Sequence, residues 1–375
     1  MNGLVNRIRQ LQDLGQKVWL DEPLGSALLG GKLGRLIEED GVSGVCCDPC
    51  LPGGNFADHK AEKKTVRERA PASDPAHQAP DGPALHIARE TADALHRTFR
   101  NSQAYDGFVT VAISLAAAST DAAEMIAEAH RLRDVLGRTN VLIQVPATRE
   151  GLTAIRQLTV EGISVSAALI FGVSRYREVL DAYLTGLEDR RSRGESLDGI
   201  ISIARLAVDP INAMVDEQLR SLTARSQEQR NRALLGKAGV QVARFAYQIY
   251  KKTLASPRWA ALAAHGARPQ RLLFADSCAA GRTGGGVKHV DQLIGRDSII
   301  ALTLETLSAY RVHGNPTPSL ESSPYEVATF LVDLSEAGID LERVSQQLQV
   351  EHARHLAEHK PRTDRRVAEI SNLMA

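Results

Sequence analysis

Eight short runs of apolar and β-branched residues, spaced along most of the chain, constrain its fold more than any other feature. Most of them lack the polar alternation of a strand with one wet face, which predicts parallel strands buried on both faces. The runs are residues 18–21, 41–48, 108–114, 141–145, 164–171, 199–208, 271–276 and 298–302.

Amphipathic stretches of helical character separate most of these runs. Examples are residues 120–137, 148–162 and 174–194, the first of which starts with an N-cap pair and ends at a glycine. Alternating strands and helices indicate a parallel sheet, and eight such units in 375 residues indicate a (β/α)8 TIM barrel. We expect one domain over residues 1–375.

Two regions depart from this rhythm. Residues 50–90 are rich in proline, alanine and charge, which predicts a long loop after the second strand, either covering the barrel mouth or forming a tolerated surface insertion. The charged segment 323–375 is expected to form C-terminal helices.

Composition narrows the classes of function. Net formal charge is zero and aromatics make up only 4% of residues, so no nucleic-acid partner is expected. No apolar run is long enough to span a membrane and the N-terminus does not read as a signal peptide, so we expect a cytoplasmic protein whose four cysteines are thiols. A homodimer is compatible with the sequence.

Several stretches together resemble the transaldolase family, over roughly residues 8–350. They include "YDGFVTVAIS", "NVLIQVPATREGLTAIRQL" and "EGISVSAALIFGVSRYREVLDAYLTGLEDR". The resemblance implies a (β/α)8 barrel that moves a dihydroxyacetone unit between sugar phosphates in the pentose phosphate pathway. It also implies a Schiff base between a fourth-strand lysine and the ketose carbonyl.

The fourth strand departs from that pattern. The family motif I-K-V-P-A-T reads Ile-Gln-Val-Pro-Ala-Thr over residues 143–148, so Gln144 stands where the resemblance places the lysine. An amide nitrogen is delocalised into its carbonyl and cannot form an imine. No lysine falls in any of the other predicted strands, 18–21 included.

The resemblance indicates further changes at the expected site. The first-strand aspartate is kept as Asp21, the asparagine after the second strand is Asp48, and the serine after the seventh is Asp276. The third-strand glutamate is Ala112. Ala168 stands at the family's fifth-strand threonine, and Arg205 stands at a serine of the sixth-strand phosphate motif. Pro210 stands at the phosphate-binding arginine, and Cys278 at a basic or polar position after the seventh strand.

The carboxyl ends of barrel strands carry function, so a new polar site is expected there. We expect Asp21, Asp48, Gln144 and Asp276 to be its catalytic residues. Substrate-binding residues are expected to be Arg205, Ser166, Ser277, Cys50 and Cys278. Arg205 would hold an anionic group, or alternatively pair with Asp21, Asp48 or Asp276.

No cofactor and no metal are expected, although three aspartates at one mouth could hold a divalent cation. The cysteines of "CCDPC" and Cys278 are read as small buried residues rather than zinc ligands, since Cys46 and Cys47 point to opposite sides of a strand. His352, His355 and His359 share one helical face and are read as solvated.

Three functions remain open. The first is an enzyme of altered chemistry that acts on a small anionic or carbonyl metabolite, for example in specialised biosynthesis. The second is a non-catalytic pseudoenzyme that binds a ligand or a protein. The third is a sugar-phosphate transaldolase that uses another nucleophile.

Overall fold

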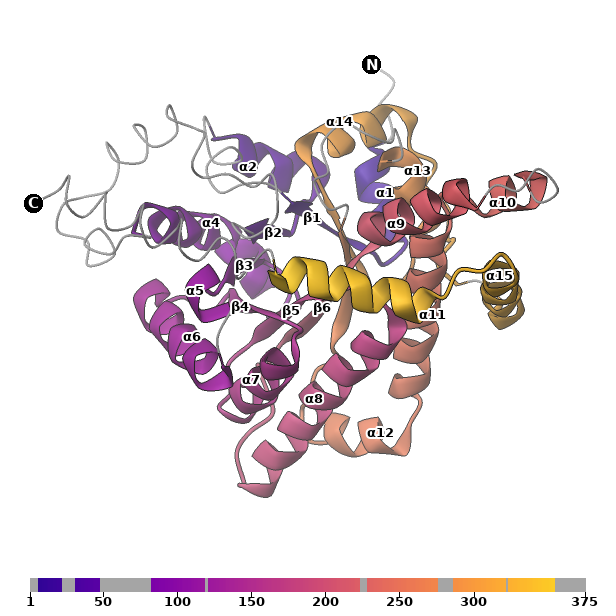
Figure 1. The fold of residues 1–375 in the computed structure, drawn as a ribbon. Helices are drawn as coiled ribbons and strands as arrows, with labels where there is room; N and C mark the ends of the chain where they lie inside the picture. The colour runs from indigo at the N-terminus through magenta and orange to yellow at the C-terminus, as the bar shows by residue number, and fades with distance from the viewer. Residues whose placement is uncertain are drawn as a thin grey trace, which may run out of the picture.

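Eight parallel strands close into a barrel in sequential order, β1-β2-β3-β4-β5-β6-β7-β8, with β8 paired to β1 (Figure 1). The computed structural model describes residues 6–21, 31–47, 82–118, 121–222, 228–275, 286–321 and 323–354. The predicted TIM barrel is confirmed, and all eight predicted strands are present. They are β1 (Lys17–Asp21), β2 (Gly44–Cys47), β3 (Phe108–Ala112), β4 (Val141–Pro146), β5 (Val165–Ile170), β6 (Ser202–Ala207), β7 (Arg271–Ala275) and β8 (Ile299–Leu302).

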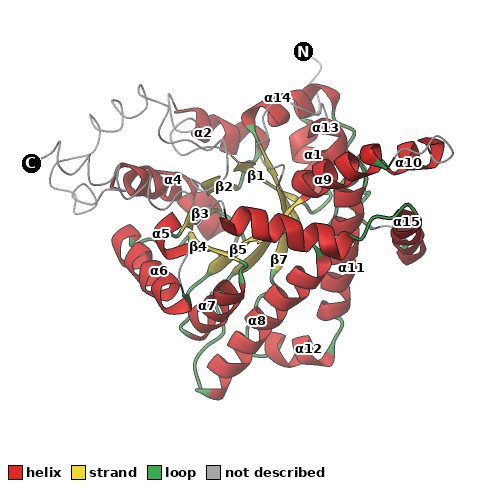
Figure 2. Ribbon diagram, viewed as in Figure 1, coloured by secondary structure: helices red, strands yellow, loops and turns green. Residues whose placement is uncertain are grey.

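Helices surround the barrel as an outer layer (Figure 2). Those of the first half are α1 (Arg7–Asp13), α2 (Lys32–Arg35) with its π-helical continuation η2 (Leu36–Asp40), α4 (Gly82–Asn101), α5 (Leu115–Ala118), α6 (Ala122–Leu136) and α7 (Arg149–Val160). The second half contains α8 (Val173–Ser192), α9 (Val208–Ser221), α10 (Glu228–Leu234), α11 (Ala238–Leu254), α12 (Pro257–Ala263), α13 (Gly286–Gln292), α14 (Leu304–His313), α15 (Pro324–Glu336) and a last helix over residues 341–354.

Local signals set where the helices begin and end. The Asp121 side chain accepts from Glu124 N at the start of α6, and Gly137 ends that helix at φ 56°. The Thr148 hydroxyl accepts from Gly151 N at 3.0 Å and caps α7 directly after β4. Such caps satisfy backbone donors that a helix start leaves unpaired.

Two predicted boundaries are wrong, for local reasons. The predicted loop 50–90 is helical from Gly82 onward, because a proline in the first helical turn is compatible with a helix; residues 50–81 lie outside the described part. The predicted strand 41–48 starts only at Gly44, since Gly41 adopts φ 70° as the C-cap of η2. In segment 323–375, α15 and helix 341–354 are present as predicted, and residues 355–375 are outside the described part.

Side chains of each strand alternate between the barrel interior and the surrounding helices. The outward residues, such as Val18, Leu20, Ile143 and Val145, belong to the large core shared with the helices. The inward residues form a second apolar cluster made of Trp19, Cys46, Phe108, Leu142, Ile201, Ile203, Leu273, Ala275, Ile299 and Ala301. This alternation fixes which polar residues face the interior.

The amino end of the barrel is filled by aromatic and charged side chains. Trp19 Nε1 donates to Asp106 Oδ1 at 2.9 Å, and a Cβ on Gly44 would lie 2.3 Å from the Trp19 ring. Arg271, at the start of β7, stacks over the Tyr105 ring at 4.4 Å and donates to Tyr105 O. The interior is therefore packed at this end, and the polar groups of the opposite end are the ones available for function.

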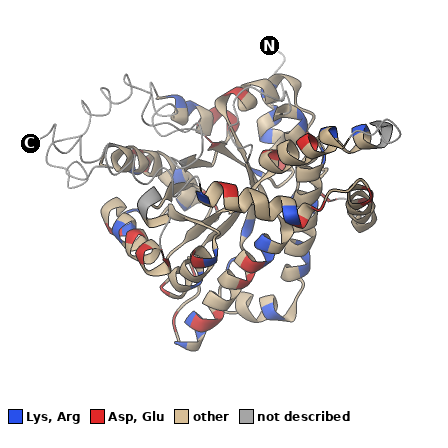
Figure 3. Cartoon of the chain, viewed as in Figure 1, with Lys and Arg blue, Asp and Glu red and all other residues tan. Residues whose placement is uncertain are grey.

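Charges of both signs are interspersed over the outer helices (Figure 3). Within the described ranges, no helix combines the length and the apolar character that a membrane crossing requires. In the view of Figure 3, the described helices carry no patch of a single charge sign.

Candidate functional site at the carboxyl end of the barrel

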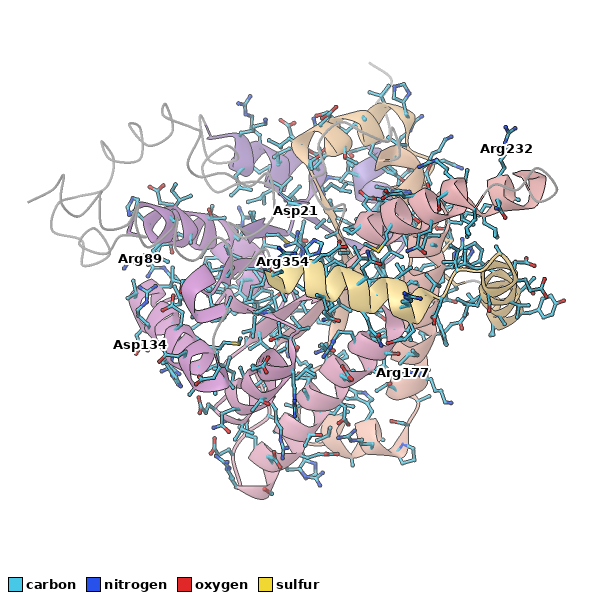
Figure 4. The ribbon with its side chains drawn as sticks, viewed as in Figure 1. Asp21, Arg89, Asp134, Arg177, Arg232 and Arg354 are labelled. Atoms are coloured by element: carbon cyan, nitrogen blue, oxygen red, sulfur yellow. The ribbon has the colours of Figure 1, made fainter. Side chains whose placement is uncertain are left out.

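A buried ion pair crosses the carboxyl end of the barrel interior. Arg205 Nη2 on β6 donates to both carboxylate oxygens of Asp21 on β1, at 3.0 Å to Oδ1 and 2.8 Å to Oδ2. Strands β1 and β6 are not neighbours in the sheet, so the contact runs through the interior. Each side chain is only 5% exposed. Figure 4 labels Asp21 among the side chains drawn as sticks.

Of the two roles left open for Arg205, pairing with an aspartate is present, and the aspartate is Asp21. A buried guanidinium and a buried carboxylate stabilise each other, whereas either charge buried alone would destabilise the fold. The pair thus forms a buried polar element inside the barrel whose two formal charges cancel.

Gln144 and Ser166 lie side by side in the same interior. The register pairs Ala112 with Gln144, and Gln144 with Ser166, so β3, β4 and β5 present these residues at one level. Flanking Ile143, Val145, Val165 and Ala167 all belong to the outer core, which turns the intervening side chains inward. Gln144 is 3% and Ser166 0% exposed.

The hydroxyl of Ser166 has no hydrogen-bond partner among the described residues. A buried hydroxyl without a partner costs free energy, because it has lost its water and gained nothing in exchange. Small side chains surround this level: Ala112 on β3 and Ala168 on β5 have the interior-facing positions next to it. The barrel interior thus contains an amide next to a hydroxyl, and a buried ion pair, all of which are groups that can hydrogen-bond a small polar molecule.

Comparison with known proteins agrees with this architecture. A family model described as transaldolase/fructose-6-phosphate aldolase matches residues 18–360. The chain belongs to this family. A transaldolase from Thiobacillus denitrificans is 34% identical over 351 residues, covering 92% of this chain and 95% of that protein. Transaldolases from Saccharopolyspora erythraea and Thermobifida fusca are 33% and 32% identical, with 90% and 92% of both chains covered.

Part of the predicted site of this transaldolase-family chain lies outside the described residues. Those positions are Asp48, Cys50, Asp276, Ser277 and Cys278. The structure therefore pairs Asp21 with Arg205 across the barrel interior and sets Gln144 beside Ser166 on neighbouring strands, and the remaining five positions stay predictions. Cys46 is buried in the inner apolar cluster, as a small core residue.

Among the described residues, no lysine lies at the carboxyl end of a strand, and the sequence analysis needs one correction. Lys17 is the first residue of β1, so a strand does contain a lysine, but at the amino end of the barrel, next to Ile299. The strand begins one residue earlier than its apolar run because pairing with β8 includes the charged residue. The other described lysines lie on helices or beside them: Lys32, Lys237, Lys251, Lys252 and Lys288.

The sequence analysis missed a contact between a histidine and an aspartate at the edge of the same face. His289 Nδ1 on α13 lies 2.9 Å from Asp209 Oδ1, on the first turn of α9 after β6. Asn212 Oδ1 accepts from Gly239 N at 2.8 Å, so Asn212 Nδ2 is the atom facing His289 Nε2 at 3.4 Å. In the neutral histidine, Nε2 then accepts and Nδ1–H donates to Asp209. The two residues are 80 positions apart, and they meet because their helices follow the neighbouring strands β6 and β7.

No group of three or more histidine, cysteine, aspartate or glutamate side chains within the described ranges has the arrangement of a metal site. The polar groups described in the barrel interior are a paired carboxylate and guanidinium, and an amide next to a hydroxyl. These groups hydrogen-bond carbonyl, hydroxyl and carboxylate functions, and a carboxylate also accepts protons.

Proposed function

We propose that this transaldolase-family chain is an enzyme of altered chemistry, which acts on a small anionic or carbonyl-bearing metabolite without a lysine imine at its fourth strand. The observation that carries the proposal is Gln144: it is buried and faces the barrel interior between Ala112 and Ser166. The family resemblance puts the Schiff-base lysine at this position. An amide there leaves no nucleophilic amine to capture a ketose carbonyl.

Neighbouring residues support the same proposal. Ala112 stands where the resemblance has the acid/base glutamate, so that carboxylate is missing at the interior face of β3. Asp21 and Arg205 instead supply one carboxylate and one guanidinium, bonded to each other. A substrate able to insert a carbonyl or carboxylate beside this pair would meet both a hydrogen-bond donor and a proton acceptor.

Trapping of an imine tests the proposal directly. The protein is incubated with fructose 6-phosphate or dihydroxyacetone phosphate, reduced with sodium borohydride and weighed by intact mass spectrometry. We expect no adduct on the wild type and an adduct on Gln144→Lys, because the new amine would face the interior. Gln346→Lys, which places a lysine on the exposed face of helix 341–354, is the matched control and should stay unmodified. A wild-type adduct, on whichever lysine, would overturn the proposal and favour a transaldolase with another nucleophile.

Ser166→Ala tests whether the mouth is built for a ligand. Its hydroxyl is fully buried and has no described partner, so its removal should leave stability unchanged or raise it by about 1 kcal/mol. Ligand binding, measured as the thermal shift produced by dihydroxyacetone, its phosphate ester or inorganic phosphate, should weaken. A variant that loses several kcal/mol of stability in urea denaturation would show that the hydroxyl is structural instead.

A non-catalytic binding protein is the second candidate, and it shares the same described site. Exchange of substrate protons separates the two. An acid–base enzyme acting on dihydroxyacetone phosphate would exchange its carbon-bound protons with D2O faster than buffer, as followed by NMR, whereas a binding protein would not. A cytoplasmic location and a homodimer remain predictions from the sequence.

A further inference from the structure

One face of the last helix, residues 341–354, is docked on the chain that leaves strand β5. Glu342, Ser345, Gln349 and His352 follow a spacing of three, four and three residues, which puts them on a single helical face. Ser174 Oγ donates to Glu342 Oε2 at 2.7 Å, and the His352 ring lies 4.6 Å from the Phe171 ring. The histidine predicted as solvated is therefore packed against the barrel. Figure 1 shows this helix in yellow, crossing in front of the strands.

The contact is close enough to require a glycine. A Cβ on Gly172 would lie 2.4 Å from Ser345 Oγ, nearer than any real side-chain atom approaches. Gly172 is the N-cap residue of α8, and its backbone is extended. The helix is thus seated directly on the backbone at the exit of β5, with no side chain in between.

Gln349 carries the polar part of this contact. Its Nε2 donates to Ala147 O at 2.8 Å and to Leu169 O at 3.3 Å. Its Oε1 accepts from Arg175 Nε at 3.0 Å. Ala147 directly follows β4 and Leu169 lies near the end of β5, so a single amide bridges the carboxyl ends of two neighbouring strands.

The end of β5 is irregular at the point where Gln349 binds it. Leu169 has φ +60°, a region that a branched residue rarely adopts, and the β5–β6 register shifts between Ala167 and Ile170. Such a conformation persists only where its surroundings fix it. The hydrogen bond from Gln349 to the Leu169 carbonyl is one of the contacts that fix it.

We propose that Gln349 is a positioning residue for the barrel site, which it holds by clamping Ala147 and Leu169. Each of these residues lies three positions after a site residue: Ala147 after Gln144, and Leu169 after Ser166. Fixing the two strand ends relative to each other fixes the relation of the amide to the hydroxyl inside the barrel. The proposal rests on the proposed function only in taking Gln144 and Ser166 as site residues.

The test uses a reporter inside the barrel that needs no substrate. Ser166→Cys introduces a thiol of nearly the same shape, and its alkylation by iodoacetamide is followed against pH by peptide mass spectrometry. In that background, Gln349→Met removes the amide while keeping the chain length, and Gln349→Glu puts a carboxylate oxygen against the two carbonyl oxygens. Gln346→Met is the control, since Gln346 is exposed on the same helix and its Nε2 donates to Glu342 Oε1 of that helix at 3.3 Å.

We expect Gln349→Met to change the alkylation rate of the thiol at position 166 by about tenfold or to shift its pH midpoint, with a larger effect for Gln349→Glu. The Gln346→Met control should match the reporter protein. Hydrogen exchange of the amides at 168–172 should rise in the same two variants.

Two outcomes overturn the proposal. One is a lower melting temperature with an unchanged alkylation profile, which would make Gln349 a purely structural contact. The other is an effect of equal size in Gln346→Met. If Gln349→Glu does not fold, Gln349→Met alone decides between these results. An imine trapped on the wild type would refute the proposed function but would leave the alkylation result for the Gln349 variants unchanged, because the thiol reporter involves no ligand.

Discussion

The buried ion pair between Asp21 and Arg205 allows a quantitative prediction of how the free energy of unfolding changes when either partner is replaced. The perturbation is a double-mutant cycle with Asp21→Leu, Arg205→Met and the combined variant. Both side chains are 5% exposed and Arg205 Nη2 contacts both carboxylate oxygens, so each single change leaves one charge buried without its partner. The free energy of unfolding should fall by about 3–5 kcal/mol in each single variant.

The coupling energy follows from the same geometry. Two unit charges about 4 Å apart attract by about 4 kcal/mol at the effective dielectric of 20 that suits protein sites. The two single losses sum to about 6–10 kcal/mol and the double variant is expected to lose no more than about 2 kcal/mol, so the coupling energy should be about 4 kcal/mol or more. The double variant, with two apolar side chains in the interior, should lie within about 2 kcal/mol of the wild type or above it.

Equilibrium urea denaturation at pH 7, followed by far-UV circular dichroism, measures all four proteins. The matched control is the exposed pair of Arg138 and Asp93, which has two hydrogen bonds of 2.6 and 3.0 Å but side chains 38% and 56% exposed. Its cycle should give a coupling below about 1 kcal/mol. Equal couplings for the buried and the exposed pair would refute the reasoning, since burial would then contribute nothing.

Two further predictions concern the scaffold. Gly44→Ala should lower the melting temperature and the free energy of unfolding by about 1–3 kcal/mol, because the added Cβ would lie 2.3 Å from the Trp19 ring. The control is Gly34→Ala, whose added Cβ meets nothing within 4 Å and which should be neutral or stabilising in the same thermal scan. Hydrogen bonding to Arg258 lowers the pKa of Glu188 below its ordinary value of 4.5, so the pair contributes stability above that pH and loses it as the pH falls through the lower folded pKa. Arg258→Gln should therefore destabilise by less than about 1 kcal/mol at pH 7, and urea denaturation at pH 3 should show a smaller difference from the wild type; a difference that grows at low pH contradicts this sign.

The sequence by itself determined the barrel and the chemistry of its fourth strand. Near-continuous apolar runs such as 141–145, which is interrupted only by Gln144, place apolar side chains on both faces of a strand, so both faces must be covered by other parts of the protein. The amide of Gln144 is likewise a property of the residue, and the strand period of two then directs it inward once Ile143 and Val145 face the helices.

Only the tertiary structure decided which polar groups meet. Asp21 and Arg205 are 184 residues apart, and no pattern in the sequence selects Asp21 over the other aspartates as the partner. The docking of His352 on Phe171 also escaped the sequence, because a helix with polar residues on one face looks solvated until a neighbouring backbone is seen to cover that face. Pairings across a closed barrel depend on strand order and register, which are set by the packing of the whole chain rather than by local propensity.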